Sequence, residues 1–381
     1  MAKLTINVDE VLPSLAQVAG VVNAKSPLPI LSNVVFVTRM GASVEERAFS
    51  LTASDSETWV TMAVPSVEFD EEMSFCVNAA DIVKVLSNLK GKTVEMVLDN
   101  ESHTIKCSYG KGRFMLPFDG AEEFPHPNMK MDGAFERDIN SANLQRAIEK
   151  TSFAIASDKL RPIMNGIHFD FFNFGMVSVA TDGQKLAKFT DKTIVSDLAE
   201  SVGFTLPKKP AGILYGLLNG QDTEVKLMFN DKCASCSNGM FKIQTRLLEG
   251  KYPDYNRVIP KDNTVETNVD KTEILEALKR VMPMGNEKSE LVKVEFTMGS
   301  VTLSTEDATF SKSADESVDC DFASQELAIG FNATMLSEIL QNIDCESAKV
   351  CLKDPSRAGL FKPSKDDETE DYVALLMPVL V

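Results

Sequence analysis

The sequence has few of the residues on which most catalytic and metal-binding sites depend. It contains three histidines, one tryptophan and seven cysteines among 381 residues. The cysteines are scattered and odd in number, which excludes a disulfide framework. No apolar run approaches the roughly 18 residues of a membrane-spanning helix, and the N-terminal residues alternate like a strand instead of forming a signal segment. These absences predict a cytoplasmic protein without a bound metal or other cofactor.

Enzyme motifs are also missing. There is no H-E-x-x-H, no G-x-S-x-G and no G-x-G-x-x-G after a strand. Gly91-Lys92-Thr93 resembles the end of a phosphate-binding loop, but Leu86 replaces the required glycine. Cys233 and Cys236 form a lone C-x-x-C, for which residues flanking a turn are a simpler explanation than a zinc or redox site. Asp182 could be a catalytic carboxylate but is more typical of a turn after a strand. We therefore expect a non-enzymatic protein.

What the sequence does contain is a helix register that recurs at about one third of its length. Apolar residues spaced i, i+3, i+4, i+7 form one face of an α-helix. This register occurs at Ile82, Val85, Leu86 and Leu89, at Pro210, Ile213, Leu214 and Leu217, and at Leu336, Ile339, Leu340 and Ile343. A second register occurs at Val11, Leu15 and Val18, at Leu144, Ile148 and Thr151, and at Ile274, Leu278 and Val281. The pattern predicts three tandem copies of one small domain, at residues 1–130, 131–257 and 258–381.

Between these helices the sequence pattern is mostly β. Alternating or β-branched segments predict strands at residues 30–37, 93–98, 104–109, 166–172, 176–180, 225–229, 291–296 and 300–304. Short turns between neighbouring strands favour antiparallel hairpins. The charged run at residues 362–371 is typical of a solvated loop before a last apolar strand. The predicted fold class is α+β, with antiparallel sheets and two helices in each copy.

The distribution of charge is uneven. The net charge of −17 argues against a protein that coats nucleic acid with its whole surface. The predicted helices and their flanks nevertheless carry more Lys and Arg than Asp and Glu, so the strands and loops are strongly acidic. This distribution indicates a modestly positive helical layer within a negative shell.

Several segments resemble the bacterial replicative sliding clamp family, the β subunit of DNA polymerase III. The most specific is Leu248–Pro260, LEGKYPDYNRVIP, which is similar to the segment joining the second and third domains of that family. Residues 28–33, 164–169, 179–187 and 376–378 also match, in the family's order. The resemblance implies a head-to-tail homodimer whose six domains close into a ring around duplex DNA, with helices lining the hole and sheets outside. It implies a non-catalytic processivity factor in DNA replication.

A ring of this kind would hold DNA topologically, so its contacts should be few and directed at phosphates. The candidate DNA-contacting residues are Lys25, Lys84, Lys90, Arg146, Lys150, Lys208, Lys209, Lys279 and Arg280. Lys25 falls where family members carry a basic residue that contacts DNA. The others follow from helical position, which equally fits solvated helix residues.

The resemblance also implies a hydrophobic pocket between the second and third domains, where short peptides of polymerase and clamp-loader proteins dock. Its residues would be Met164, Thr181, Gly183, Gln184, Lys185, Leu186, Pro253, Arg257, Val258, Leu376, Met377, Pro378 and Val379. The sequence has Gln184-Lys185 where His-Arg is frequent, and Val379-Leu380-Val381 where many members have Met-Arg-Leu. These differences affect the polar rim and the peptide preference.

The dimer implied by the resemblance joins the first unit of one chain to the third unit of the other. Phe114 would pack near Pro283 and Met284 across that joint, and Lys111 and Arg113 would face acidic groups of the neighbour. A molar mass of about twice 41.8 kDa would favour the ring.

Two other classes of protein are alternatives to the clamp. A hydrolase or transferase on a repeated α+β scaffold would use Asp182 with a neighbouring carboxylate, although the duplicated registers lack the asymmetry of an active site. A purely structural repeat protein would have no partner pocket.

Overall fold

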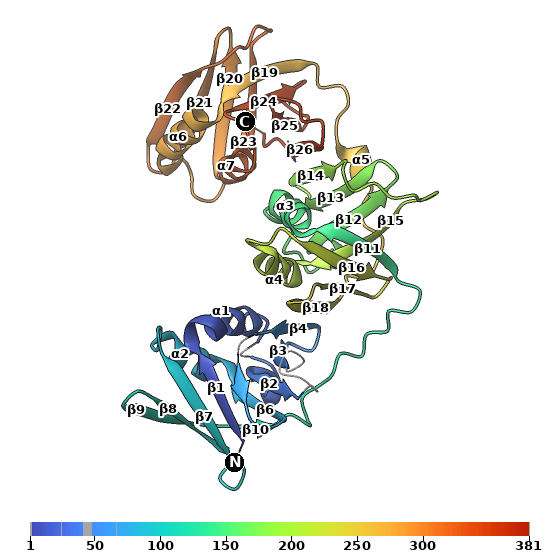
Figure 1. The fold of residues 1–381 in the computed structure, drawn as a ribbon. Helices are drawn as coiled ribbons and strands as arrows, with labels where there is room; N and C mark the ends of the chain where they lie inside the picture. Colours follow the sequence, from blue (N-terminus) through green and yellow to red (C-terminus); the bar gives the residue numbers. More distant parts are fainter. Residues whose placement is uncertain (1, 24, 41–47, 66, 381) are drawn as a thin grey trace. The chain divides into compact units, whose positions relative to one another are not determined.

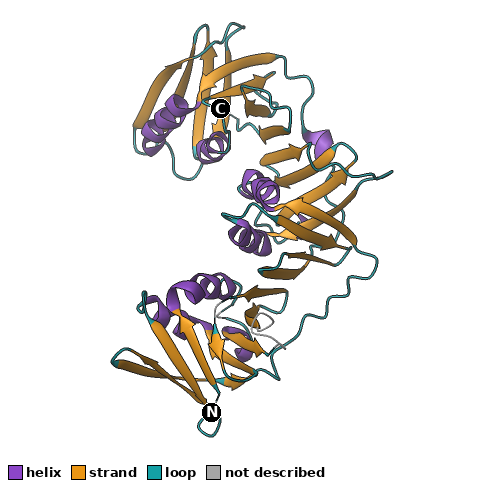
Figure 2. Cartoon of the chain, in the orientation of Figure 1, coloured by secondary structure: helices purple, strands orange, loops and turns teal. Residues whose placement is uncertain are grey.

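The computed structural model describes residues 2–23, 25–40, 48–65 and 67–380. It divides into two compact units, one formed by residues 1–145 and 209–247 and the other by residues 146–208 and 248–381 (Figure 1). Antiparallel strands make up most of each unit, and helices lie beside them (Figure 2).

The first unit contains two antiparallel sheets. The smaller has the order β5 (Glu68–Phe69), β1 (Lys3–Asn7), β7 (Thr93–Asp99), β8 (Thr104–Tyr109), β9 (Gly112–Pro117). The larger has the order β10 (Asp119–Gly120), β6 (Met73–Asn78), β2 (Asn33–Arg39), β3 (Ala48–Ser54), β4 (Thr58–Ala63), β18 (Phe241–Arg246), β17 (Cys233–Ser237), β16 (Glu224–Phe229), β11 (Phe135–Asn140). Its helical elements are α1 (Val8–Ala19), the 3-10 turn η1 (Pro29–Ser32), α2 (Ala79–Ser87), most of α4 (Lys208–Leu218) and the start of α3 (Ser141–Ser152).

The second unit also contains two antiparallel sheets. The larger has the order β15 (Val202–Pro207), β12 (Gly166–Phe172), β13 (Gly175–Thr181), β14 (Lys185–Asp191), β26 (Glu370–Leu376), β25 (Gly359–Pro363), β24 (Ser347–Leu352), β19 (Val265–Asp270). The smaller has the order β22 (Lys312–Asp319), β21 (Ser300–Asp307), β20 (Leu291–Thr297), β23 (Leu327–Asn332). Its helical elements are the rest of α3, η3 (Pro162–Met164), α5 (Tyr255–Val258), α6 (Lys271–Val281), η4 (Met282–Met284) and α7 (Ala333–Gln341).

The strand pairing repeats three times along the chain. A first meander is formed by β2-β3-β4, then by β12-β13-β14, then by β20-β21-β22. A second meander is formed by β7-β8-β9, then by β16-β17-β18, then by β24-β25-β26. In each repeat, one strand pairs with the first strand of the second meander and leads into a helix; these strands are β1, β11 and β19. Another strand pairs with the first strand of the first meander and also leads into a helix; these strands are β6, β15 and β23. The predicted α+β fold of three tandem copies is therefore confirmed.

Local sequence explains where the helices begin. An Asn or Asp ends the preceding strand, and its side chain accepts a hydrogen bond from a backbone N–H of the first turn. Such caps are formed by Asn7 for α1, Asn78 for α2, Asn140 for α3, Asp270 for α6 and Asn332 for α7. The predicted apolar faces are buried in α1, α3 and α6, and in the other helices only Val85 and Ile213 are half-buried.

The predicted start of the strand at residues 30–37 was wrong. Residues 30–32 form the 3-10 turn η1, and strand β2 begins only at Asn33. Pro29 explains the difference, because its fixed φ and missing N–H suit the first turn of a helix better than a strand ladder.

Candidate DNA-contacting and docking surfaces

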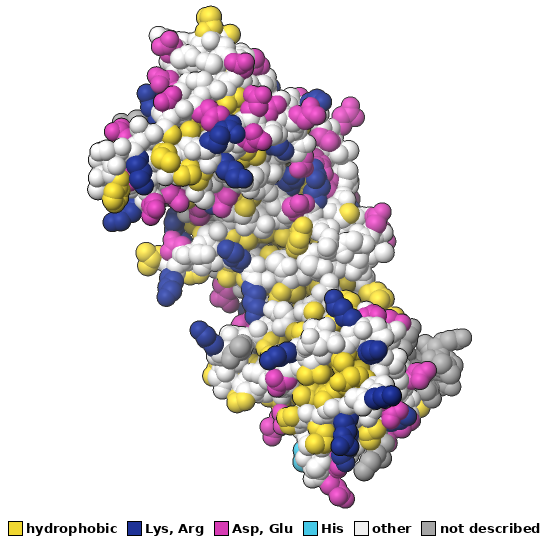
Figure 3. All heavy atoms as spheres, turned by 90° about the vertical axis from the view of Figure 1, so that its left-hand side faces the viewer, with side chains coloured by type: hydrophobic (Ala, Val, Ile, Leu, Met, Phe, Trp, Pro, Cys, Tyr) yellow, Lys and Arg dark blue, Asp and Glu magenta, His cyan; other side chains and the backbone are white. Residues whose placement is uncertain are grey.

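Five of the nine basic residues expected to contact DNA are exposed and form no ion pair within the described part of the chain. They are Lys25, Lys84, Lys90, Lys208 and Lys279. Lys84 lies on α2, Lys279 on α6 and Lys208 at the start of α4. Figure 3 shows Lys and Arg side chains beside apolar ones on the face it presents of the N-terminal repeat, in the lower part of the view. The ammonium groups of these five lysines are therefore free to contact the phosphates of a DNA backbone.

The other four basic residues are engaged by carboxylates. Arg146 on α3 donates to both Glu370 oxygens at 2.5 and 2.6 Å and lies 2.8 Å from Asp344. Lys209 Nζ contacts Asp55 at 2.5 Å and donates to the Val21 carbonyl at 2.6 Å. Arg280 pairs with Glu316 of β22 at 2.6 Å. Their charges are partly neutralised by these partners.

Lys150 departs most from its predicted role. It is only 4% exposed, and its ammonium group contacts Asp344 at 2.5 Å and the Asn342 carbonyl at 2.8 Å. The expectation that it faces solvent on the helix surface was wrong, because Asn342 and Asp344 of the segment after α7 and the ring of Tyr372 on β26 surround its ammonium group. Arg146 and Lys150 line a cavity of about 510 Å³ together with Cys345 and Tyr372.

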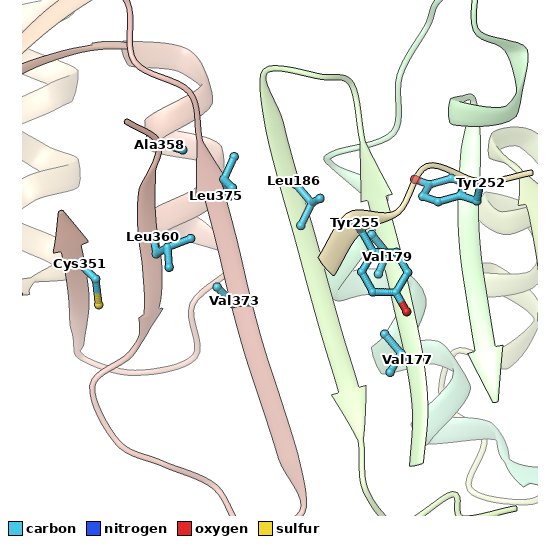
Figure 4. Close-up of a cluster of buried hydrophobic side chains, with 10 residues drawn as sticks. All are labelled: Val177, Val179, Leu186, Tyr252, Tyr255, Cys351, Ala358, Leu360, Val373 and Leu375. Carbon is cyan, nitrogen blue, oxygen red and sulfur yellow. The ribbon is translucent and has the colours of Figure 1, made fainter. Parts of the chain in front are cut away.

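The expected peptide pocket lies around an apolar cluster on one face of the larger sheet of the second unit. Val177, Val179 and Leu186 come from β13 and β14, Cys351, Leu360, Val373 and Leu375 from β24 to β26, Ala358 from the loop before β25, and Tyr252 and Tyr255 from the linker between β18 and β19 (Figure 4). Ile163, Phe172 and Ile259 pack against its edge. We call this set the linker-side cluster. Most of its β24–β26 members were not predicted from the sequence, although the apolar Val373-Ala-Leu-Leu segment was a signal for those on β26.

The predicted pocket residues fall into two groups relative to this cluster. Leu186 belongs to it, and Pro253, Arg257 and Val258 extend from the linker that covers it. Lys185 of β14 pairs with Leu376 of β26, and each is next in sequence to a member of the cluster, Leu186 or Leu375. Because neighbours along a strand face opposite sides, the side chains of Lys185 and Leu376 project to the opposite, helix-covered face of the sheet. Lys185 is 8% exposed, and its Nζ lies 2.6 Å from Glu338 on α7. It therefore lies beneath the paired strands β14 and β26 instead of forming a polar rim.

The turn between β13 and β14 carries several of the residues predicted for the pocket. Asp182 Oδ1 accepts hydrogen bonds from the N–H groups of Gln184 and Lys185, both at 2.8 Å. Thr181 Oγ1 accepts from Gly183 N–H and donates to the Lys185 carbonyl. Gly183 has φ +91°, which a residue with a side chain rarely adopts. Asp182 is therefore a turn residue, as the sequence favoured.

The C-terminal tail, which carries further residues predicted for the pocket, is held by two backbone hydrogen bonds. Met377 N–H donates to the Gln184 carbonyl and Val379 N–H to the Gly330 carbonyl, both at 2.8 Å. The tail thus joins the β13–β14 turn to the edge of β23. Met377 and Val379 remain exposed, as does Val258 of the linker. Exposed apolar side chains beside a buried cluster are suited to apolar peptide anchors. Met164 is buried in η3 next to Ile163 of the cluster edge.

The predicted dimer residues lie on or beside edge strands of the two units. On β9, Phe114 and Leu116 are half-buried and alternate with exposed Arg113 and Met115, and Lys111 lies in the preceding turn. Pro283 and Met284 are exposed on η4, which packs against β21 and β22.

The structure gives no support for metal chemistry at the cysteine pair. Cys233 and Cys236 lie three residues apart on β17, so their side chains project to opposite faces. All seven thiols are free. Within the described ranges, no group of three His, Cys, Asp or Glu residues is placed to hold a metal ion, and no helix is long and apolar enough to cross a membrane.

Comparison with solved structures defines the class of protein. The chain is similar to the sliding clamp (DNA polymerase III subunit beta) of Bartonella birtlesii bound to griselimycin, with a TM-score of 0.91, 25% identity and complete coverage of both chains. It is similar to the DNA polymerase sliding clamp of Pseudomonas aeruginosa with ligand, with a TM-score of 0.89, 26% identity and complete coverage. The fold is therefore a sliding-clamp fold.

Sequence comparison gives the family. The beta sliding clamps of Pseudomonas aeruginosa and Vibrio cholerae are 29% and 27% identical to the chain, over 98% and 99% of its length and 99% of theirs. Models of the N-terminal, central and C-terminal domains of the DNA polymerase III beta subunit match residues 2–129, 138–254 and 256–379. The chain belongs to the DNA polymerase III beta subunit family.

Proposed function

We propose that this chain is a DNA sliding clamp that gives the replicative polymerase processivity. Two copies close head to tail into a ring around duplex DNA, and the surface around the linker-side cluster docks peptides of the polymerase and clamp loader. The chain is a processivity factor and not an enzyme, in keeping with its family. We further propose repeat boundaries near residues 130 and 257 and a cytoplasmic location.

The observation that carries the ring is the way consecutive repeats are joined. The first and second repeats are joined by β4 and β18, and the second and third by β14 and β26. In both joints, one repeat contributes the last strand of its first meander, β4 or β14. The following repeat contributes the last strand of its second meander, β18 or β26. Among the strands of the described residues, only β22 and β9 remain of these two strand types, and each lies at the edge of its sheet. Pairing β22 of one copy with β9 of the next would repeat the same joint.

The chemistry of these two edges supports their pairing. Strand β22 carries Asp315 and Asp319, besides Glu316, which already pairs with Arg280, whereas Arg113 lies on β9 and Lys111 in the turn before it. Opposite charges favour this pairing and disfavour pairing of either strand with its own copy. On the helix-facing side, Phe114 and Leu116 would meet Met284 of η4 as an apolar centre.

The ring is tested by Met284→Asp, which places a charge in the proposed apolar centre. We expect a folded monomer at micromolar concentration, whereas the unchanged protein should have about twice 41.8 kDa by sedimentation equilibrium. Met298→Asp is the matched control, because Met298 is exposed at the β20–β21 turn, which bonds to Cys320 past the C-terminal end of β22, whereas the segment of Met284 lies against Thr305 near the opposite end of these strands. A dimeric Met284→Asp variant would contradict this joint.

For DNA, we propose contacts by the five exposed lysines, with weaker roles for Arg146, Lys209 and Arg280. Binding to linear duplex should be weak and salt-sensitive, and replacing Lys25, Lys84 and Lys90 with Gln should lower the salt slope by about one per lysine. Lys226→Gln is the control, because Lys226 pairs with Glu136 on β11. Protein loaded on closed circular DNA should resist salt that strips it from linear DNA, and equal salt sensitivity would refute topological retention.

For docking, we propose that the β13–β14 turn, the linker and the tail form the peptide-binding wall. Deletion of the last five residues should abolish binding of a short fluorescein-labelled peptide with one Gln and two apolar anchors, while the dimer persists. Micromolar affinity is expected for so small a contact. If the truncated protein bound the peptide as tightly as the full-length protein, measured by fluorescence anisotropy, the site would lie elsewhere.

A further inference from the structure

Most of the linker between β18 and β19 is attached to its sheet by side chains and not by backbone hydrogen bonds. Leu248 N–H donates to the Thr205 carbonyl, and the next regular pairing begins at Val265 in β19. Within the described residues, no backbone hydrogen bond joins residues 249–262 to a strand. Side chains therefore hold this segment in place, and two tyrosines, Tyr252 and Tyr255, are its most deeply buried residues.

Tyr252 is placed by a histidine from β12. The two rings stack with centroids 4.6 Å apart and planes within 5° of parallel. The imidazole is fixed on both sides, because His168 Nδ1 lies 3.0 Å from Thr205 Oγ1 and Nε2 lies 3.3 Å from Asp170 Oδ2. The histidine thus offers a preoriented flat surface to the linker.

Tyr255 is placed by the same carboxylate. Its hydroxyl donates to Asp170 Oδ2 at 2.9 Å, and Lys188 Nζ lies 5.8 Å from its ring centroid. Burial is the main cause that raises the pKa of Tyr252 and Tyr255, so both hydroxyls stay neutral at physiological pH. Tyr255 lies over Val177 and Val179 in the linker-side cluster (Figure 4).

We propose that His168 and Asp170 are positioning residues for peptide docking, which they serve by holding Tyr252 and Tyr255 and so the linker wall. This inference rests on the proposed docking function. Arg257 and Val258 share the single-turn helix α5 with Tyr255, so a movement of Tyr255 displaces both. A peptide can bind only the fraction of molecules whose linker is in place, and the apparent Kd is inversely proportional to that fraction.

The test compares His168→Ala, His168→Phe, Asp170→Asn and Tyr255→Phe in the full-length protein. The probe is the same labelled peptide, measured by anisotropy and stopped-flow mixing. We expect His168→Ala to weaken binding about tenfold, mainly through a slower association rate, since fewer molecules have the linker in place. His168→Phe keeps the stacking surface and should recover most of the affinity. Tyr215→Phe on α4 is the matched control for Tyr255→Phe and should bind normally.

Hydrogen exchange gives a second measure that a purely structural role would not link to binding. The amide of Arg257, which donates to the Asp254 carbonyl within the linker, should exchange faster in His168→Ala and Tyr255→Phe than in the unchanged protein, and the variant with the faster exchange should bind the peptide more weakly. The dimer mass should not change. Normal peptide affinity in both variants, or faster exchange without weaker binding, would overturn the positioning role. Failure of the unchanged protein to bind the peptide would instead refute the docking function, and this inference with it.

Discussion

The two joints between consecutive repeats use the same strand pairing but are reinforced differently. The first joint pairs β4 with β18 over five residues, and its ion pairs, Lys209–Asp55 and Arg246–Glu57, lie near the surface. The second joint pairs β14 with β26 over seven residues. Lys150 and Lys185 are buried beneath it, and the tyrosines of the linker cover its other face. The joint that carries the docking surface is thus fixed on both faces of its sheet.

This difference shows that one strand topology can serve two purposes. At the first joint the ladder and a few exposed contacts suffice to connect two repeats. At the second joint, several segments must keep a fixed arrangement if a peptide is to bind without a large ordering cost. Buried lysine–carboxylate pairs do not by themselves prove high stability, but loss of one partner is costly.

The largest expected effect comes from the apolar cluster of the second joint. Leu375→Ala should lower the free energy of unfolding by about 3 kcal/mol, because a buried leucine is replaced by a cavity. Chemical denaturation measures the loss, and peptide binding should weaken as well. Met62→Ala on β4 truncates a buried side chain of the first joint and should destabilise without affecting the peptide. If both variants impaired the peptide equally, the two joints would not differ as described.

A smaller effect is expected from the ion pairs. Asp344→Asn should destabilise by about 1 kcal/mol, because Lys150 is buried while half of the Asp344 side chain is exposed and screened. Asp55→Asn at the first joint should cost less, since Lys209 can be hydrated there. Denaturant midpoints of the two variants make the comparison, and a larger loss for Asp55→Asn would reverse it.

Acid should weaken the second joint through the same carboxylate. Burial alone would raise the pKa of Asp344, but the hydrogen bond from Lys150 and the charges of Lys150 and Arg146 outweigh it, so the pKa is lowered. A carboxylate whose pKa is lowered in the folded protein contributes its full stabilisation at pH values above its pKa in the unfolded chain, which is about 3.9. This stabilisation is lost as the pH falls through the pKa of the folded protein. Below about pH 4, the difference in denaturant midpoint between the unchanged protein and Asp344→Asn should shrink. A constant difference down to pH 2 would exclude this linkage.

The smallest effect belongs to the exposed pair of the first joint. Arg246→Gln should change the free energy of unfolding by less than about 0.5 kcal/mol, because Arg246 and Glu57 are both mostly exposed. Thermal unfolding at low and high salt would measure it. A loss of several kcal/mol would mean that the first joint also depends on its ions.

The sequence predicted the repeat well because helix periodicity is a local property. Leu144, Ile148 and Thr151 are buried together, as their spacing requires. The burial of Lys150 was not predictable in this way, because its partner Asp344 is distant in sequence and only the tertiary fold brings them together. The position of Lys185 could have been foreseen, since neighbours along a strand face opposite sides and Leu186 is apolar. The stacking of His168 on Tyr252 left no periodic signal.

The cysteines of this fold provide a means of observing it. Burial raises the pKa of Cys76, Cys107 and Cys236 to about 12, so these thiols are protonated and unreactive at neutral pH. Cys345 is half-buried and lines the cavity at the second joint, and Cys320, also half-buried, follows the edge strand β22. The rate at which a thiol reagent modifies Cys345 therefore reports opening of the second joint, and modification of Cys320 reports on the edge beside it. The native chain thus carries its own chemical probes at both places, without an engineered label.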